Sequence, residues 1–156
     1  MEGGVIPIHI LLGRYKTWII ASFLSSALLI SHGVRRDMDA VFQAGDKTVI
    51  VKGSRVRYLR PDQDSGEGYV KAVLRGKASQ MGAIIQEEYD IQKPCLNVTQ
   101  FNGADFFTMD PHKYKSFIYG ERIEDCVTGF LGAEVPVNLM PAVINIILDR
   151  SKAVGG

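Results

Sequence analysis

The sequence predicts a single α/β domain, built on a mostly parallel sheet with helices on both faces. Strand-like apolar runs alternate with helical segments along the chain, which is typical of this architecture. The length of 156 residues suits one domain with one core, and no repeat, linker or low-complexity tract divides it. We therefore expect residues 1–156 to fold as one unit.

The first half of the chain predicts short strands around one long helix. The strands are expected at 5–12, 40–43, 48–52 and 56–59. Gly53-Ser54 is expected to turn the last two strands into a hairpin. The helix is expected at 17–31 because its residues are mostly apolar, and Gly33 is placed to end it.

The second half continues the alternation. Turn residues at 61–66 precede a helix at 67–74, which Gly76 ends. The pattern at 82–92 is open between helix and strand. Three strands and a last helix follow, at 96–101, 116–119, 127–131 and 137–150. Pro141 is expected to break or bend this helix.

The composition is that of an ordinary globular protein, with 46% apolar and 22% charged residues. The net charge is +1, so any contact with nucleic acid has to come from a local patch of cations. Cys95 and Cys126 are expected to be reduced thiols packed as small hydrophobes. The three histidines are scattered, and no metal site is expected.

The most apolar stretch, at 18–30, raises the question of a membrane. A spanning helix needs about 20 apolar residues. This run is shorter, contains three serines and is followed by His32 and Arg35. We therefore expect a helix buried in the core or at a subunit interface, with a membrane anchor as the alternative.

Cations gather where elements end. They are Arg35, Arg36, Arg55, Arg57 and Arg60. Guanidinium groups bind phosphates through paired hydrogen bonds and stack on bases, so such a cluster can bind RNA in a chain of near-zero net charge. A solvated charged surface is the other interpretation, and the residues alone leave both open.

Three expected strand ends carry glycine or asparagine: Asn102-Gly103, Gly120 and Gly132. In open α/β sheets, ligands bind just beyond the carboxyl ends of the strands. Glycine there lets the backbone approach a ligand closely. The pattern indicates a small-molecule site, or else three ordinary turns.

A family resemblance is carried by the segment 31–37, which reads Ser-His-Gly-Val-Arg-Arg-Asp and follows an apolar helix. It resembles the SHxIRRD segment of archaeal tRNA pseudouridine N1-methyltransferases, which belong to the SPOUT superfamily of trefoil-knotted enzymes. Further similar segments occur in the family's order at 13–14, 53–62, 102–105, 117–122 and 144–150.

The resemblance implies a SPOUT-type α/β knot, with a C-terminal trefoil knot and S-adenosyl-L-methionine bound by three loops. Carried over by position, the cofactor residues are Thr99, Asn102, Gly103, Gly120, Thr128, Gly129, Phe130, Leu131, Gly132, Ala133 and Met140. The implied residues at the target base are Arg36, Asp37 and Arg60, and those on the RNA are Arg35, Arg55 and Arg57. The implied protein is a cytoplasmic homodimer that methylates N1 of pseudouridine in the T-loop of tRNA.

Several alternatives stay open. Asp37 can act as an orienting group or base, or it can pair with an adjacent arginine. The sequence departs from the family at Glu121-Arg122, which stand in place of Asp-His, and its segments at 79–96 and 120–132 are shorter. Ribosomal RNA pseudouridine N1-methylation and a non-catalytic RNA-binding module without a cofactor site are the other functions considered.

Overall fold

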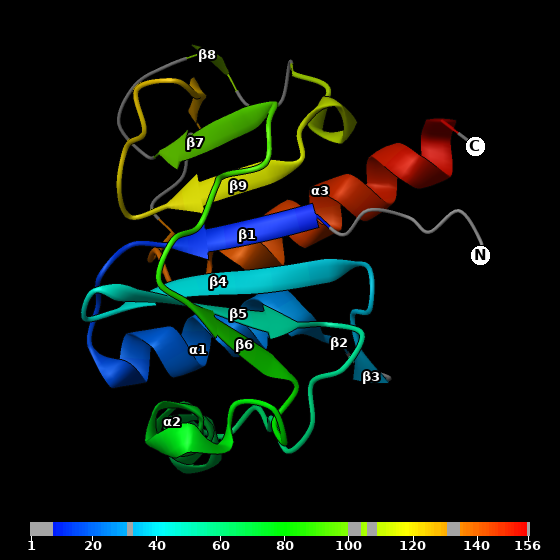
Figure 1. Ribbon diagram of the computed structural model, residues 1–156. Helices are drawn as coiled ribbons and strands as arrows, with labels where there is room; N and C mark the ends of the chain where they lie inside the picture. The colour runs from blue at the N-terminus through cyan, green and yellow to red at the C-terminus, as the bar shows by residue number, and fades with distance from the viewer. Residues whose placement is uncertain (1–7, 31–32, 100–103, 106–108, 131–134, 156) are drawn as a thin grey trace, which may run out of the picture.

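The computed structural model describes residues 8–30, 33–99, 104–105, 109–130 and 135–155. The strands of the main sheet are β1 (Ile8–Leu12), β4 (Met38–Ala44), β5 (Lys47–Lys52), β6 (Ala83–Gln86), β7 (Cys95–Thr99), β8 (Ala104–Asp105), β9 (Ser116–Tyr119) and β10 (Val127–Phe130). Within the described residues they form one sheet of eight strands in the order β6-β5-β4-β1-β9-β7-β10-β8 (Figure 1).

The predicted mixed α/β fold with a mostly parallel sheet is confirmed. The pairings from β4 through β1, β9, β7 and β10 to β8 are all parallel. The hairpin of β4 with β5 and the edge strand β6 are antiparallel. The four central strands β1, β9, β7 and β10 therefore end at the same edge of the sheet.

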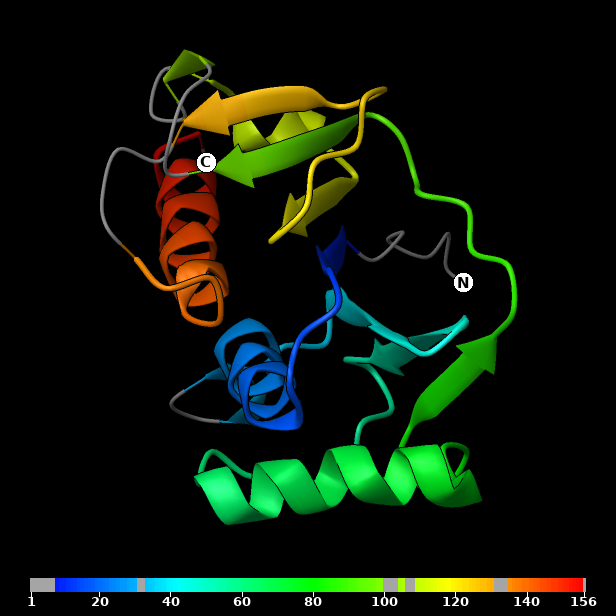
Figure 2. The same cartoon turned by 90° about the vertical axis from the view of Figure 1, so that its left-hand side faces the viewer.

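The helices lie on one face of this sheet. They are α1 (Thr17–Leu28), α2 (Gln63–Ala72) and α3 (Met140–Gly155), with a π-helical turn at Val73–Lys77 and a 3₁₀ turn at Pro111–Lys113. Ile10 and Leu12 of β1 point into the core that these helices share, whereas Leu11 points to the opposite face. Figure 2 shows α1 and α3 side by side on this face.

The prediction of helices on both faces is wrong for the described residues. The opposite face is covered by the extended segment 87–94, which crosses from β6 to β7 (Figure 2). Its Tyr89 and Ile91 pack on a small apolar cluster that contains Leu11, Val41 and Ile118. Alternation of strands and helices predicts the presence of helices but does not fix the face that each connection takes.

The long apolar helix forms α1, and its apolar character is explained by burial. Ile20, Phe23, Leu24 and Leu28 are at most 5% exposed, because α1 lies between the sheet, α2 and α3. The helix ends earlier than predicted, since Leu29 adopts extended backbone and opens a short hairpin of β2 (Leu29–Ile30) with β3 (Gly33–Val34). None of the described helices is both long enough and apolar enough to cross a membrane.

Other boundaries move for local reasons. Residues 56–59 form no strand, and the hairpin turns at Gly45-Asp46 instead of Gly53-Ser54. The second helix begins before the predicted 67–74, because the Asp62 carboxylate accepts a hydrogen bond from the Ser65 N–H (3.0 Å) and caps it. The ambiguous segment 82–92 contains β6.

The last helix starts three residues later than predicted, at Met140, so Pro141 falls in its first turn. A proline there lacks only an N–H that would have no partner within the helix. The expected break is therefore not needed, and the helix continues through Gly155.

The expectation of two reduced cysteines is wrong. Cys95, at the start of β7, and Cys126, just before β10, are joined by a disulfide and are almost fully buried. Two cysteines are too few to predict a disulfide framework, and their pairing depends on the neighbouring positions of β7 and β10 in the sheet.

A buried polar cluster lies under the segment 87–94. The fully buried Asp39 carboxylate lies 3.3 Å from Lys52 Nζ and 3.4 Å from His9 Nε2, and it accepts a hydrogen bond from the Gly53 N–H (3.3 Å). His9 is also hydrogen-bonded to the Tyr89 hydroxyl. Burial opposes the charge on Asp39, but His9 and Lys52 outweigh it and lower the pKa of this carboxyl below its ordinary value of 3.8.

The variant Asp39→Asn is expected to be less stable than the wild type by about 1–3 kcal/mol at neutral pH, because it removes a buried ion pair. Since the folded-state pKa is lowered, this stabilisation is present above the ordinary pKa of 3.8 and is lost as the pH falls through the lowered value. Urea unfolding at several pH values measures the difference in stability between the variant and the wild type, which should disappear as the pH falls through the lowered pKa of Asp39. Asp90→Asn, which removes an exposed carboxylate of the segment 87–94, is the control; a difference that persists in acid would contradict the assignment.

Candidate functional site

A pocket of about 470 Å³ opens where the parallel strands end at their carboxyl edge. Thr99 ends β7, Gly120 directly follows β9, and Thr128 lies in β10. Met140, the first residue of α3, lines the pocket from the helical face. Parallel pairing of β9, β7 and β10 brings these four lining residues together from distant parts of the sequence.

The pocket wall at Gly120 is shaped by the close approach of the Tyr15 ring to the Gly120 backbone. Gly120 has a φ of +80°, which side-chain-bearing residues rarely adopt. A Cβ there would lie 2.5 Å from the ring of Tyr15. The Tyr15 hydroxyl in turn donates a long hydrogen bond (3.4 Å) to the Gly120 carbonyl. Glycine is therefore required both for the turn and for the room that the tyrosine ring occupies.

The loop after Gly120 is fixed by hydrogen bonds to the Asn97 side chain of β7. The Asn97 amide donates to the carbonyls of Ile123 (2.9 Å) and Cys126 (3.3 Å), and its oxygen accepts from the Ile123 N–H (2.9 Å). The disulfide ties the same loop to β7 at its far end. Glu121 and Arg122, which line the pocket and are exposed, thus belong to a loop with several fixed points.

The pocket combines apolar walls with a few polar groups. Val98, Val137 and Met140 offer apolar surface, while Thr99 and Thr128 offer hydroxyls. Its volume is within the range of small-molecule sites, about 300–1,000 Å³. Such a site can bury a flat ring or an alkyl chain and fix it through a small number of hydrogen bonds.

The structure brings together four of the predicted cofactor residues, Thr99, Gly120, Thr128 and Met140. Gly129 and Phe130 follow Thr128 in β10. Five others lie outside the described residues: Asn102, Gly103, Leu131, Gly132 and Ala133. Of the three glycine corners that are expected to converge, Gly120 alone lies within the described residues, so their convergence stays a prediction.

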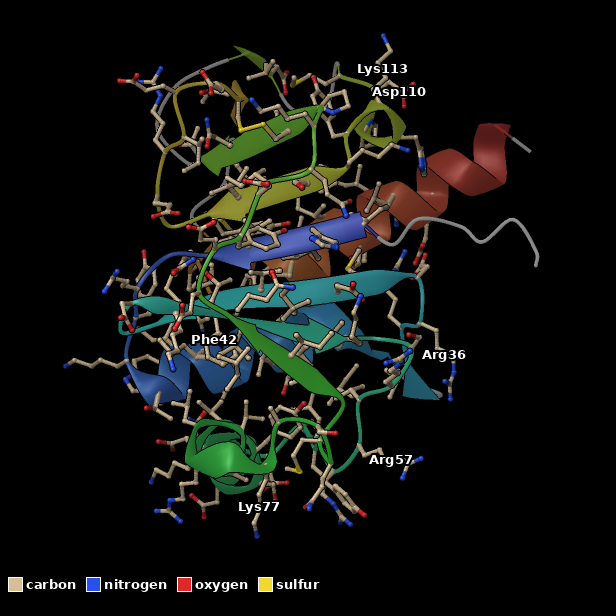
Figure 3. The ribbon with its side chains drawn as sticks, in the orientation of Figure 1. Arg36, Phe42, Arg57, Lys77, Asp110 and Lys113 are labelled. Carbon is tan, nitrogen blue, oxygen red and sulfur yellow. A yellow bond between two sulfur atoms is a disulfide. The ribbon has the colours of Figure 1, made fainter. Side chains whose placement is uncertain are left out.

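The predicted arginine cluster lies at the other edge of the sheet. Arg36 precedes β4, and Arg55 and Arg57 follow β5, so all three stand where the central strands begin, not where they end. Figure 3 shows Arg36 and Arg57 extending from the same side of the molecule. Within one chain, the expected arginines at the mouth of the cofactor pocket are not found among the described residues; Arg122 is the arginine that lines it.

Arg35, which is predicted to contact RNA, is largely buried in an ion-pair network within the chain. It is 8% exposed, and its guanidinium donates two hydrogen bonds to the Asp149 carboxylate of α3 (2.8 and 3.0 Å). Its Nε lies 3.1 Å from Asp37 Oδ1. Burial opposes the charge, but Asp149 and Asp37 outweigh it and raise the pKa of the guanidinium above its ordinary value. Arg35 is therefore a structural ion-pair residue.

The two roles left open for Asp37 are partly resolved by this contact, because Asp37 pairs with the adjacent Arg35. Arg60 is exposed and stands just before the N-cap residue Asp62 of α2, so it is not part of the Arg36 group. Among the described residues, no three histidine, cysteine, aspartate or glutamate side chains gather as metal ligands.

Several pocket residues carried no sequence signal. Tyr15 and Asn97 act through packing and backbone hydrogen bonds, and Pro136 and Val137 line the pocket just before α3. Asn97 alone offered a hint, since an amide inside an apolar strand has to be satisfied when it is buried.

The fold and the pocket define the class: an α/β domain with a pocket of small-molecule size at the carboxyl edge of a mostly parallel sheet. Over 65 residues the chain is 32% identical to a protein named tRNA (pseudouridine(54)-N(1))-methyltransferase from Halobacterium salinarum. The match covers 41% of this chain and 33% of the relative, so it spans about a third of the relative's length. No family model matches the chain.

Asn97→Ala is expected to release the loop at 121–126 and to cost about 1–3 kcal/mol, because it leaves buried backbone groups without their partner. Hydrogen exchange at the Ile123 amide should become markedly faster. Asn138→Ala, which removes a hydrogen bond to the Ser22 hydroxyl (2.9 Å) on the helical face, is the control. Equal exchange at Ile123 in both variants would contradict the role given to Asn97.

Proposed function

We propose that the protein is an S-adenosyl-L-methionine-dependent RNA methyltransferase that methylates N1 of pseudouridine in the T-loop of tRNA. The observation that carries the proposal is the pocket at the carboxyl edge, where Thr99, Gly120, Thr128 and Met140 meet as the family resemblance implies. The partial similarity to a tRNA methyltransferase supports the same class of reaction. A cytoplasmic location is part of the proposal, and the Cys95–Cys126 disulfide is the observation that counts against it, because disulfides are rare in cytosolic proteins.

The residues of the pocket suit this cofactor. Val98, Val137 and Met140 can contact the adenine and methionine chains, and Thr99 and Thr128 can bind the polar groups. At Gly120 the absence of a side chain makes room for the Tyr15 ring, which lines the same pocket. The exposed Glu121 carboxylate provides a negative charge beside a ligand that carries positive charge. When bound, S-adenosylmethionine supplies an activated methyl group.

The separation of the arginines from the pocket favours a homodimer. Because Arg36 lies at the opposite edge of the sheet, the site would be completed by the arginines of a second chain across a two-fold axis. The helical face has apolar surface for such a contact, since Trp18, Leu139 and Ile146 are 49%, 44% and 54% exposed. A trefoil knot is proposed with it, supported by the strand order in which β7 lies between the later strands β9 and β10.

The chemical roles follow from charge. The N1 atom of pseudouridine becomes a nucleophile as its proton leaves, and Arg36 would stabilise the anion, since Arg60 stands apart from the Arg36 group. Asp37 is the carboxylate nearest to this group in the sequence, and we assign to it the positioning of the segment through Arg35, with proton acceptance through water as its second role.

One alternative has an observation in its favour. The arginines form a pocket of their own, independent of the cofactor site, so a non-catalytic RNA-binding module could use them alone.

Ribosomal RNA is the other candidate substrate. Transcripts that carry pseudouridine in a tRNA T-loop or in a ribosomal hairpin separate these substrates in a methyl-transfer assay.

Gly120→Ala is expected to weaken S-adenosylmethionine binding about tenfold or more, which corresponds to about 1.4 kcal/mol, because the new Cβ displaces the Tyr15 ring. Isothermal titration calorimetry measures this change. Gly76→Ala is the matched control: Gly76 also has a left-handed backbone (φ +104°), but nothing lies within 4 Å of its Cβ position. If the wild type itself shows no binding, the methyltransferase proposal fails and the RNA-binding module remains.

Mixing two impaired variants, at a cofactor concentration too low to saturate Gly120→Ala, tests the site across the two-fold axis. Arg36→Ala should lower turnover far more than cofactor affinity, and Gly120→Ala should damage the pocket. When the two are unfolded and refolded together, half of the dimers should be mixed, and each mixed dimer regains one intact site. Methyl transfer should therefore return to about a quarter of the wild-type rate. No recovery, or a monomer in sedimentation, would contradict the shared site.

A further inference from the structure

A second pocket, of about 510 Å³, lies between the residues that precede β4 and those that follow β5. Its cations are Arg36, Arg55 and Arg57, all of them exposed. Ser54, Ser79 and Gln80 add polar groups, and none of the described side chains that line this pocket is acidic. Below, these residues are called the arginine pocket.

The backbone of the arginine pocket is fixed by two glycines. A Cβ on Gly53 would lie 2.1 Å from the Met38 carbonyl oxygen, and one on Gly82 would lie 2.3 Å from the Arg55 carbonyl oxygen. No side chain fits at either position, so the three segments of the pocket are packed backbone against backbone. The walls are therefore set before any ligand binds.

Hydrogen bonds hold the arginine-bearing residues in this frame. The Arg57 N–H donates to the Met81 carbonyl (3.2 Å), and the Arg36 guanidinium donates to the Ser54 carbonyl (3.2 Å). Val56 and Leu59 pack against the core on either side of Arg57. The buried pair of Arg35 with Asp149 anchors the residue next to Arg36. Three positive charges are thus held near one another despite their mutual repulsion.

Tyr58, next to Arg57, stands out for two reasons. Its side chain is 68% exposed, more than any other large apolar side chain in the described part of the chain. Among the described residues other than glycine it alone has a positive φ, +69°. Left-handed backbone costs a residue with a Cβ roughly 1–2 kcal/mol, so the fold retains a strained residue in order to hold an aromatic ring in solvent.

We propose that the arginine pocket binds the phosphodiester backbone of RNA and that Tyr58 stacks on an adjacent unpaired base. This inference rests on the proposed function for its choice of RNA as the ligand. Arginines bind phosphates in a bidentate manner, and an exposed aromatic ring beside them is the pattern of single-stranded nucleic-acid sites. Unpaired RNA, not the double helix, offers base faces for stacking.

A neighbouring pocket suggests where the bound RNA chain continues. A smaller pocket shares Arg55, Ser79 and Gly82 with the arginine pocket and adds Lys52 and the partly exposed Ile84. Because Lys52 is paired with the buried Asp39, this smaller pocket contributes mainly apolar surface, on which a base can rest.

Binding of a fluorescein-labelled, uridine-rich single-stranded RNA to the full chain, without S-adenosylmethionine, tests the proposal. Tyr58→Asn should weaken binding roughly tenfold with an unchanged salt dependence, whereas Tyr58→Phe should bind as the wild type does. Asparagine tolerates left-handed backbone, so the loss reports the ring and not a distorted loop. Arg57→Gln should weaken binding and lower the slope of log K against log salt by about one.

Arg75→Gln, which changes an exposed arginine outside the pocket, is the matched control and should leave binding unchanged. Wild-type affinity in both Tyr58→Asn and Arg57→Gln would overturn the inference while leaving the methyltransferase proposal intact. If the wild type does not bind S-adenosylmethionine but its RNA binding still depends on Tyr58, the methyltransferase proposal fails and the inference about Tyr58 stands. Competition by uridine monophosphate as effective as by the unlabelled RNA would identify a mononucleotide pocket and would also overturn the inference.

Discussion

The parallel pairing of β7 with β9 on one side and β10 on the other is the constraint on which the candidate site depends. Hydrogen bonding in this register makes strands that are distant in sequence end at the same edge, so Thr99, Gly120 and Thr128 meet. The Asn97 amide and the Cys95–Cys126 disulfide reinforce the same arrangement, since both link β7 to the loop before β10. The pocket is thus a product of sheet topology, with side chains that refine it.

Much of the fold was predictable because its strongest signals are local. The strand at 116–119 and the helix of apolar residues after β1 follow from periodicity and burial, which short segments reveal. The faces taken by the connections were not predictable. Residues 87–94 cover one face in extended form, with Tyr89 and Ile91 as anchors, and such contacts depend on partners far away in the chain.

The candidate site was predicted in part, for a comparable reason. Strand-end residues such as Gly120 can be recognised from sequence, since a tight turn needs glycine. Whether an arginine is buried or exposed cannot be recognised in this way. Two neighbouring arginines differ here, because Arg35 is a buried structural residue and Arg36 is exposed. What separates them is Asp149, which lies 114 positions away from Arg35. Charge clusters therefore predict a basic region but do not tell which members are free to bind a ligand.

The pair formed by Arg35 and Asp149 also bears on how the chain can mature during synthesis. The guanidinium leaves the ribosome 114 residues before the carboxylate that receives two of its hydrogen bonds. Until α3 emerges, Arg35 has to stay hydrated, because a buried guanidinium without that partner would be costly. Burial of the Arg35 guanidinium therefore has to wait until the last helix has docked, so this ion pair closes late in the folding of the chain.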